Sequence, residues 1–219
     1  MLETKILELK QMLLTEASLV EKMVSLSADG IYTRQTGLLD RINKYEEQVN
    51  QLELELENKC IAAIALFQPE ARDLRKIIMI LKINNDLERL GDQAVNIAES
   101  AEHLAGRAVV AQVAELAQMK DSALAMLKSS LDAFAGENVE ASQAVCDADD
   151  QVDELNRAVY HRLVELIKQD TPLTESCLHL LRIAKNLERI ADLSTNVAEN
   201  TVYLAVGKVI KHHQGEDQG

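Results

Sequence analysis

The sequence predicts an all-α protein built from two three-helix units in tandem. Residues 84–99 read NNDLERLGDQAVNIAE, and residues 184–199 read AKNLERIADLSTNVAE, with seven identities and no gap. Such a match over two turns and more of helix indicates an internal repeat. The composition agrees, because a chain with no Trp, two Phe and much Leu, Ala and Val is typical of packed helices.

Three helices are expected in the first unit. Apolar residues at helical spacing predict a helix over residues 3–28 that stops near Gly30. A second helix is predicted from about residue 34 to residue 67, because apolar side chains recur there in steps of three and four. This seam comprises Ile42, Tyr45, Val49, Leu52, Leu56, Ala63 and Phe67. Pro69 suits the first turn of a third helix, which carries the first repeat segment and ends near Gly106.

The same order is expected in the second unit. Residues 108–135 form the predicted fourth helix, with its end at Gly136. Asn138 is a suitable cap for a fifth helix. Thr171 and Pro172 form a cap-plus-first-turn signal for the sixth, which carries the second repeat segment and fades near Gly207.

The domain boundaries follow from this order. We assign residues 1–106 to the first three-helix repeat and residues 107–208 to the second. Residues 209–219 lack an apolar pattern and are expected to form a disordered tail.

Charge and composition exclude several functions. The 23 basic and 36 acidic residues give a net charge of -13, which argues against nucleic acid or an anionic bilayer as the main partner. No secretory signal or membrane-spanning apolar run is visible, and three cysteines without a paired motif favour a cytoplasmic location. The sequence has no phosphate-binding glycine loop, zinc pattern or nucleophile elbow, so we do not expect an enzyme.

Acidic residues form a row on each repeat segment. On the third predicted helix, Glu88, Asp92 and Glu99 fall within about 40° of one another. Glu188, Asp192 and Glu199 occupy the matching positions of the sixth. The simplest interpretation is that these carboxylates form a solvated face and pair with Arg89 and Arg189. Because the acidic pattern is repeated in both units, we give equal weight to a second interpretation.

That second interpretation is a pair of metal sites. Glu46 and Asn50 in the second predicted helix, and Asp149 and Asp153 in the fifth, also place oxygen ligands one turn apart. Two such pairs facing each other would form an oxygen-only cage suited to Mg²⁺, Mn²⁺, Ca²⁺ or ferric iron.

Histidines are interpreted as surface or satisfied residues. His103, His161 and His179 are isolated along the chain. Glu99 with His103 and Glu175 with His179 are spaced by four residues, whereas ferritin-like di-iron helices space Glu and His by three.

The two LERxxDxxxNxAE segments, together with ARDLR at residues 71–75, resemble the PhoU family of phosphate-signalling proteins. The resemblance covers nearly the whole chain. It implies two pseudo-symmetric three-helix bundles, a cytoplasmic location and a homodimer. It also implies a negative regulator that couples the ATPase subunit of the high-affinity phosphate ABC transporter to a membrane sensor histidine kinase.

The resemblance further implies metal-binding E(D)xxxD motifs. These correspond to Glu88 with Asp92, Glu188 with Asp192, and Asp149 with Asp153, whereas the fourth motif has Asn50 in place of an acid after Glu46. We therefore expect weaker metal binding in the first repeat. The identity of the metal is open among Fe, Mn, Mg, Zn and Ca.

Two other functions stay open. Related domains accompany other phosphate and ion transporters, so the chain is alternatively an adaptor with a different client. A cytosolic metal-binding or storage protein is the other alternative, and it predicts many metal ions per chain and no transporter contact.

Overall fold

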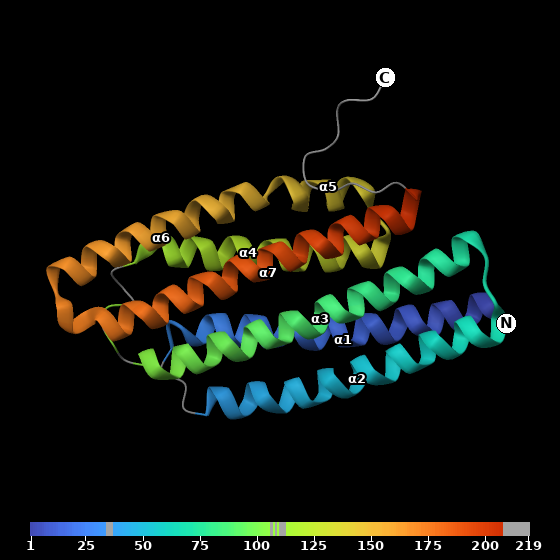
Figure 1. Cartoon of the computed structure of the whole chain (residues 1–219), viewed down its shortest axis with the longest axis horizontal. Helices are drawn as coiled ribbons and strands as arrows, with labels where there is room; N and C mark the ends of the chain where they lie inside the picture. Colours follow the sequence, from blue (N-terminus) through green and yellow to red (C-terminus); the bar gives the residue numbers. More distant parts are fainter. Residues whose placement is uncertain (34–36, 106, 108, 110–112, 208–219) are drawn as a thin grey trace, which may run out of the picture.

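The structure is a computed structural model that describes residues 1–33, 37–105, 107, 109 and 113–207. The described residues form two antiparallel helical bundles lying side by side along one long axis (Figure 1). This arrangement confirms the predicted fold class. Two predictions lie outside the described residues: the end of the third helix near Gly106, and the disordered tail at residues 209–219.

The first bundle contains α1 (Leu2–Gly30), α2 (Leu38–Phe67) and α3 (Ala71–Leu104). Its helices pack through the seam predicted for α2. Every seventh residue of that seam is at most 1% exposed: Ile42, Val49, Leu56 and Ala63. Because these residues occupy one stripe of the helix, α2 is held against α1 and α3 along its whole length.

The second bundle contains α4 (Ala114–Gly136), α5 (Val139–Asp147), α6 (Asp149–Gln169) and α7 (Thr174–Val206), with a short 3₁₀ turn, η2 (Thr171–Leu173), before α7. The predicted fifth helix is therefore wrong in one respect, because it is divided at Ala148. The local bonds there span three residues: Ala148 N donates to Val145 O, and Gln151 N donates to Ala148 O.

The acidic sequence explains this division. Asp147 ends α5, where the negative end of the helix dipole disfavours a carboxylate, and Asp149 and Asp150 begin α6, where the dipole favours carboxylates. Aspartate also has a low helix propensity. A helix that stops and restarts at Ala148 suits these three side chains better than a continuous one.

Helix starts agree with the sequence in part. Asn138 Oδ1 accepts a hydrogen bond from Ala141 N at 3.0 Å, which confirms the predicted cap. Pro69 precedes α3 by two residues, with Glu70 as the N-cap, so its predicted place in the first turn is wrong. Thr171 and Pro172 form η2 and not the first turn of α7, because α7 begins at Thr174.

The two repeat segments meet at the centre of the molecule. α3 and α7 pack against each other, α1 and α2 cover α3, and α4, α5 and α6 cover α7 (Figure 1). The matching residues Leu87 and Leu187 are both completely buried, as are Leu90 and Ile190. The polar residues between these apolar ones therefore lie at defined positions along the packed helices α3 and α7.

None of the helices in the described ranges is long and apolar enough to cross a membrane.

Candidate metal centre

The acidic row of α3 faces α2. The pKa of Glu88 is raised by burial first, and then by the negative charges of Asp92 and Glu53. Burial likewise raises the pKa of Glu46 in α2, and the negative charge of Asp92 is the next largest cause. Since α2 runs antiparallel to α3, Glu46 lies near Asp92 and Glu53 lies near Glu88, which places four carboxylates in one row.

Glu16 extends this row into the core, and the sequence analysis missed it. The Glu16 side chain in α1 is completely buried, and neither carboxylate oxygen has a hydrogen-bond partner. Burial raises the pKa of Glu16 from 4.5 to about 8, and the charges of Glu53 and Glu88 act in the same direction. The sequence did contain a signal, because Glu16 occupies a place in the apolar stripe of α1, between Leu13 and Val20.

Glu99 and Asn50 are the other predicted ligands of the first repeat. Arg182 of α7 donates to Glu99 Oε2 at 2.7 Å and to Asn96 Oδ1 at 2.6 Å. Glu99 is therefore engaged in an ion pair between the bundles. Asn50 is exposed on α2.

The matching row of α7 is neutralised by neighbouring side chains. Glu188 accepts hydrogen bonds from Asn156 Nδ2 at 2.9 Å and from Lys185 Nζ at 2.5 Å. Asp192 Oδ2 lies 3.2 Å from Arg189 Nη1. These carboxylates are paired with donors of the second repeat, in contrast to the row around Glu88.

The remaining predicted ligands of the second repeat lie on α6 and at the far end of α7. Asp149 begins α6, and Asp153 Oδ2 lies 4.0 Å from Arg157 Nη2. Burial raises the pKa of Cys146 to about 11, and Glu199 and Asp149 raise it further through their charges. Glu199 and Asp149 are thus placed around the end of α5.

The two repeats differ most in the core. When Glu8 is aligned with Glu115, Glu16 corresponds to Ala123. When Glu46 is aligned with Asp149, Glu53 corresponds to Asn156. Ala123 is fully buried in α4. Each helix of the first bundle therefore contributes one carboxylate here, from Glu16, Glu53 and Glu88. The matching residues of the second bundle are the apolar Ala123, the amide Asn156 and the carboxylate Glu188.

A group of three different potential ligands lies where α3 and α7 meet. Among the described residues, His103, Glu175 and His179 place their ligand atoms within 4.8 Å of one another. The two imidazole rings stack with centroids 3.8 Å apart and planes inclined by 21°. The interpretation of these two histidines as isolated is wrong, because helix packing brings them together; His161 is exposed on α6.

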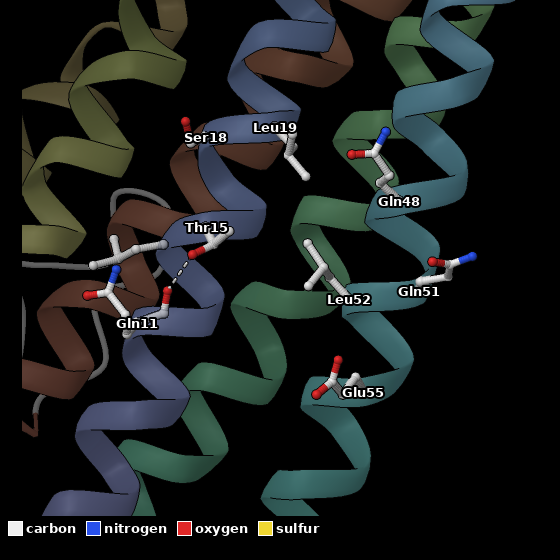
Figure 2. A pocket seen from close by; sticks show the side chains of 9 residues that line it. Gln11, Thr15, Ser18, Leu19, Gln48, Gln51, Leu52 and Glu55 are labelled. Atoms are coloured by element: carbon white, nitrogen blue, oxygen red, sulfur yellow. Dashed lines mark hydrogen bonds between the residues drawn. The ribbon is translucent and has the colours of Figure 1, made fainter.

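A groove of about 720 Å³ runs between α1 and α2 on the first bundle (Figure 2). Leu19 of α1 and Leu52 of α2 point toward each other across it, and Thr15 Oγ1 donates to Gln11 O at 3.0 Å. Its polar lining consists mostly of amides and hydroxyls, with Glu55 at one end. The groove has no basic side chain in its lining and is therefore unsuited to anions such as phosphate.

Comparison with known proteins assigns the chain to a family. The PhoU domain profile matches residues 13–101 and 116–201. A phosphate-specific transport system accessory protein PhoU homolog from Clostridium acetobutylicum is 35% identical over 209 residues, covering 95% of each chain. The homolog of the same name from Aquifex aeolicus is 34% identical over 212 residues, covering 97% of this chain and 96% of the relative.

Solved structures agree with this assignment. PhoU from Pseudomonas aeruginosa superposes with a TM-score of 0.89 at 29% identity, covering 95% of this chain and 100% of that one. The phosphate transport system regulatory protein PhoU from Streptococcus pneumoniae gives 0.86 at 27% identity, covering 97% of this chain and 100% of that one. The PhoU domain thus matches both halves of the sequence, and the chain belongs to the PhoU family.

Proposed function

We propose that this protein is a negative regulator of the phosphate-starvation response. It would couple a high-affinity phosphate ABC transporter, through the ATPase subunit, to a membrane sensor histidine kinase. The observation that carries the proposal is the match of the PhoU domain to both helical repeats, with relatives named phosphate-specific transport accessory proteins along almost the whole chain. The role is that of a cytoplasmic, non-enzymatic binding protein.

The charge of the surface supports an indirect form of phosphate sensing. With a net charge of -13 and rows of carboxylates on α3 and α7, the field of the protein repels anions. Phosphate itself is therefore a poor ligand for the isolated chain. We propose that the phosphate signal reaches this protein as a conformation of the transporter.

Metal binding by the carboxylate rows is part of the proposal. In the first repeat, Glu46, Glu88 and Asp92 would hold a hard cation, and the Asn50 amide oxygen, one helical turn from Glu46, is the fourth ligand that we propose. Burial and the neighbouring negative charges destabilise Glu46 and Glu88 as anions, and a bound cation would relieve both costs. In the second repeat, a cation would have to compete with Lys185 and Arg189 for Glu188 and Asp192.

The side chains around the two sites favour an order of affinity opposite to the one expected from Asn50 alone. The sequence predicts weaker binding in the first repeat, because Asn50 replaces an acid there. The first repeat, however, adds Glu53 and Glu16 to its row, and the second has Asn156 and Ala123 at the matching positions. We propose that the first repeat binds the cation more tightly.

Self-association has a candidate surface on α2. Leu54 is 56% exposed and Ile61 is 54% exposed, and they lie two turns apart. Two exposed apolar side chains on the outer side of α2 are candidate contacts for the homodimer that we propose. Light scattering on the wild type and on Leu54→Lys would test the dimer, with a monomeric variant expected.

Co-purification tests the partner directly. The tagged full chain would be isolated from membranes of cells grown with abundant and with scarce phosphate, and the bound proteins identified. We expect the phosphate transporter ATPase subunit together with the histidine kinase. Recovery of a different transporter's ATPase subunit, without the kinase, would support the adaptor function instead.

A further inference from the structure

The end of α3 and the start of α7 together form a small cluster that the carboxylate rows do not include. Glu175 and His179 lie one turn apart on α7, so their side chains share one face of the helix. His103 reaches them from the last turn of α3. Each of the three offers one ligand atom within 4.8 Å of the other two.

Two ring nitrogens in this cluster are buried without a hydrogen bond. His179 Nδ1 has no partner, and His103 Nε2 lies 3.3 Å from Glu175 Oε1 without the alignment that a hydrogen bond needs. Buried polar atoms of this kind are uncommon in folded proteins, because each one forfeits its interaction with water. A bound cation would supply the missing partner to both rings.

The surroundings of His179 favour its neutral form. Burial lowers the pKa of His179, and the neighbouring His103, Arg182 and Arg107 lower it further, while Glu175 acts in the opposite direction. The neutral imidazole is the form that binds metals. Arg107 Nη1 lies 3.6 Å from Glu175 Oε2 and donates to Ser176 Oγ at 3.0 Å, so it now balances the carboxylate.

We propose that His103, Glu175 and His179 form a binding site for Zn²⁺ or a similar transition-metal ion that links the two repeats. Two imidazoles and one carboxylate are a donor set typical of zinc, whereas Mg²⁺ and Ca²⁺ prefer oxygen alone. Three protein ligands leave one position of a tetrahedral ion for water.

This site is independent of the proposed regulatory function. It lies between α3 and α7, whereas the carboxylate rows extend along α2–α3 and α6–α7. Because its ligands come from both bundles, a bound ion would fasten the end of the first repeat to the start of the last helix. The ion is therefore expected to stabilise the pairing of the two bundles.

Cobalt spectroscopy on the full chain provides the test. All proteins carry His212→Gln and His213→Gln, which remove the two histidines of the C-terminal segment, and are first freed of metal with a chelator. Co²⁺ is then titrated in the presence of excess Mg²⁺, which saturates oxygen-only sites. We expect one equivalent of Co²⁺ to bind with the visible absorption of a tetrahedral ion, and one equivalent of Zn²⁺ to abolish it.

Four variants separate the site from other metal binding. His103→Gln and His179→Gln should weaken Zn²⁺ affinity by at least the roughly tenfold to hundredfold that loss of a supporting group costs. His161→Gln, at the exposed histidine of α6, should bind like the parent. Arg107→Ala removes the competing cation beside Glu175 and should strengthen binding.

The thermal melting temperature gives a second measurement. Zn²⁺ should raise it in the parent and in His161→Gln, because an ion that binds the folded state stabilises that state. The proposal is overturned if the parent binds no Co²⁺ in excess Mg²⁺. It is also overturned if folded His103→Gln and His179→Gln proteins bind Zn²⁺ as tightly as the parent.

Discussion

Glu16 should make the first bundle less stable as the pH rises, and Glu16→Gln should remove that dependence. The side chain is completely buried in α1, and its two oxygens have no hydrogen-bond partner. The variant keeps the shape of the side chain and removes the ionisable group. The difference in unfolding free energy between the wild type and the variant therefore measures what the ionisable carboxyl group costs the folded state.

The size of the effect follows from the pKa. In the folded protein the pKa of Glu16 is raised from 4.5 to about 8, so between these values the folded state binds the proton and the unfolded state releases it. Stability then falls by up to about 1.4 kcal/mol for each pH unit as the pH rises through this window. At pH 7 the accumulated cost is about 3 kcal/mol, and above about pH 8 it levels off because Glu16 ionises in both states.

Urea denaturation at half-unit steps from pH 5 to pH 8 would measure this cost. We expect the free energy of unfolding of Glu16→Gln to exceed that of the wild type by an amount that grows with pH, by about 3 kcal/mol over the range. The measurements are made in the presence of a chelator, so that metal binding to the neighbouring carboxylates does not contribute.

Glu3→Gln, at an exposed position in the first turn of α1, is the matched control. Its difference from the wild type should not change with pH as that of Glu16→Gln does. A Glu16→Gln difference that stays constant from pH 5 to pH 8 would refute the reasoning, because it would mean that Glu16 titrates at the same pH in the folded and unfolded chain.

Four further substitutions test the packing and the charges. Leu56→Ala, at a fully buried position of α2, should lower the free energy of unfolding by about 2–5 kcal/mol in urea denaturation, whereas Leu7→Ala, at an exposed position of α1, should cost less than about 1 kcal/mol. Asn156→Asp replaces the donor to Glu188 by a second carboxylate and should lower the melting temperature at pH 7, because a hydrogen bond is lost and two like charges then face each other. Arg182→Ala removes an exposed ion pair with α3 and should cost no more than about 1 kcal/mol; a loss of several kcal/mol would show that this pair holds the bundles together.

Metal titration tests the order of the two carboxylate sites. Mn²⁺ should bind less tightly to Glu46→Gln than to the wild type, and the loss should exceed that of Asp153→Asn, because the first-repeat row contains fewer compensating donors. Isothermal calorimetry on the full chain would measure both affinities. Equal losses in the two variants would contradict the proposed order.

Much of the fold was accessible from the sequence, because it depends on local periodicity. The steps of three and four from Ile42 to Phe67 predict α2 and its buried stripe, and the repeated segments predict that α3 and α7 are corresponding helices of two units. The packing of α3 against α7 was not predicted, because it is a contact between the units. The division at Ala148 was missed because the apolar pattern continues on both sides of it. There, local charge outweighs periodicity.

The candidate sites were less accessible, because they depend on what each side chain faces. The sequence could place Glu88 and Asp92 on one helix face, but the partners of each carboxylate come from other helices. Glu16 gains its meaning only from burial, and His103 and His179 meet only because α3 crosses α7. Spacing along one helix contains no information about such contacts.

Expression of a phosphate-starvation reporter tests the central claim most directly. The reporter would be measured in abundant phosphate, in the source organism with this gene deleted, and again after the wild-type gene is restored. We expect the reporter to switch on in the deletion strain and to be silenced by the restored gene. A reporter that stays off in the deletion strain would contradict the assignment as a negative regulator of phosphate signalling.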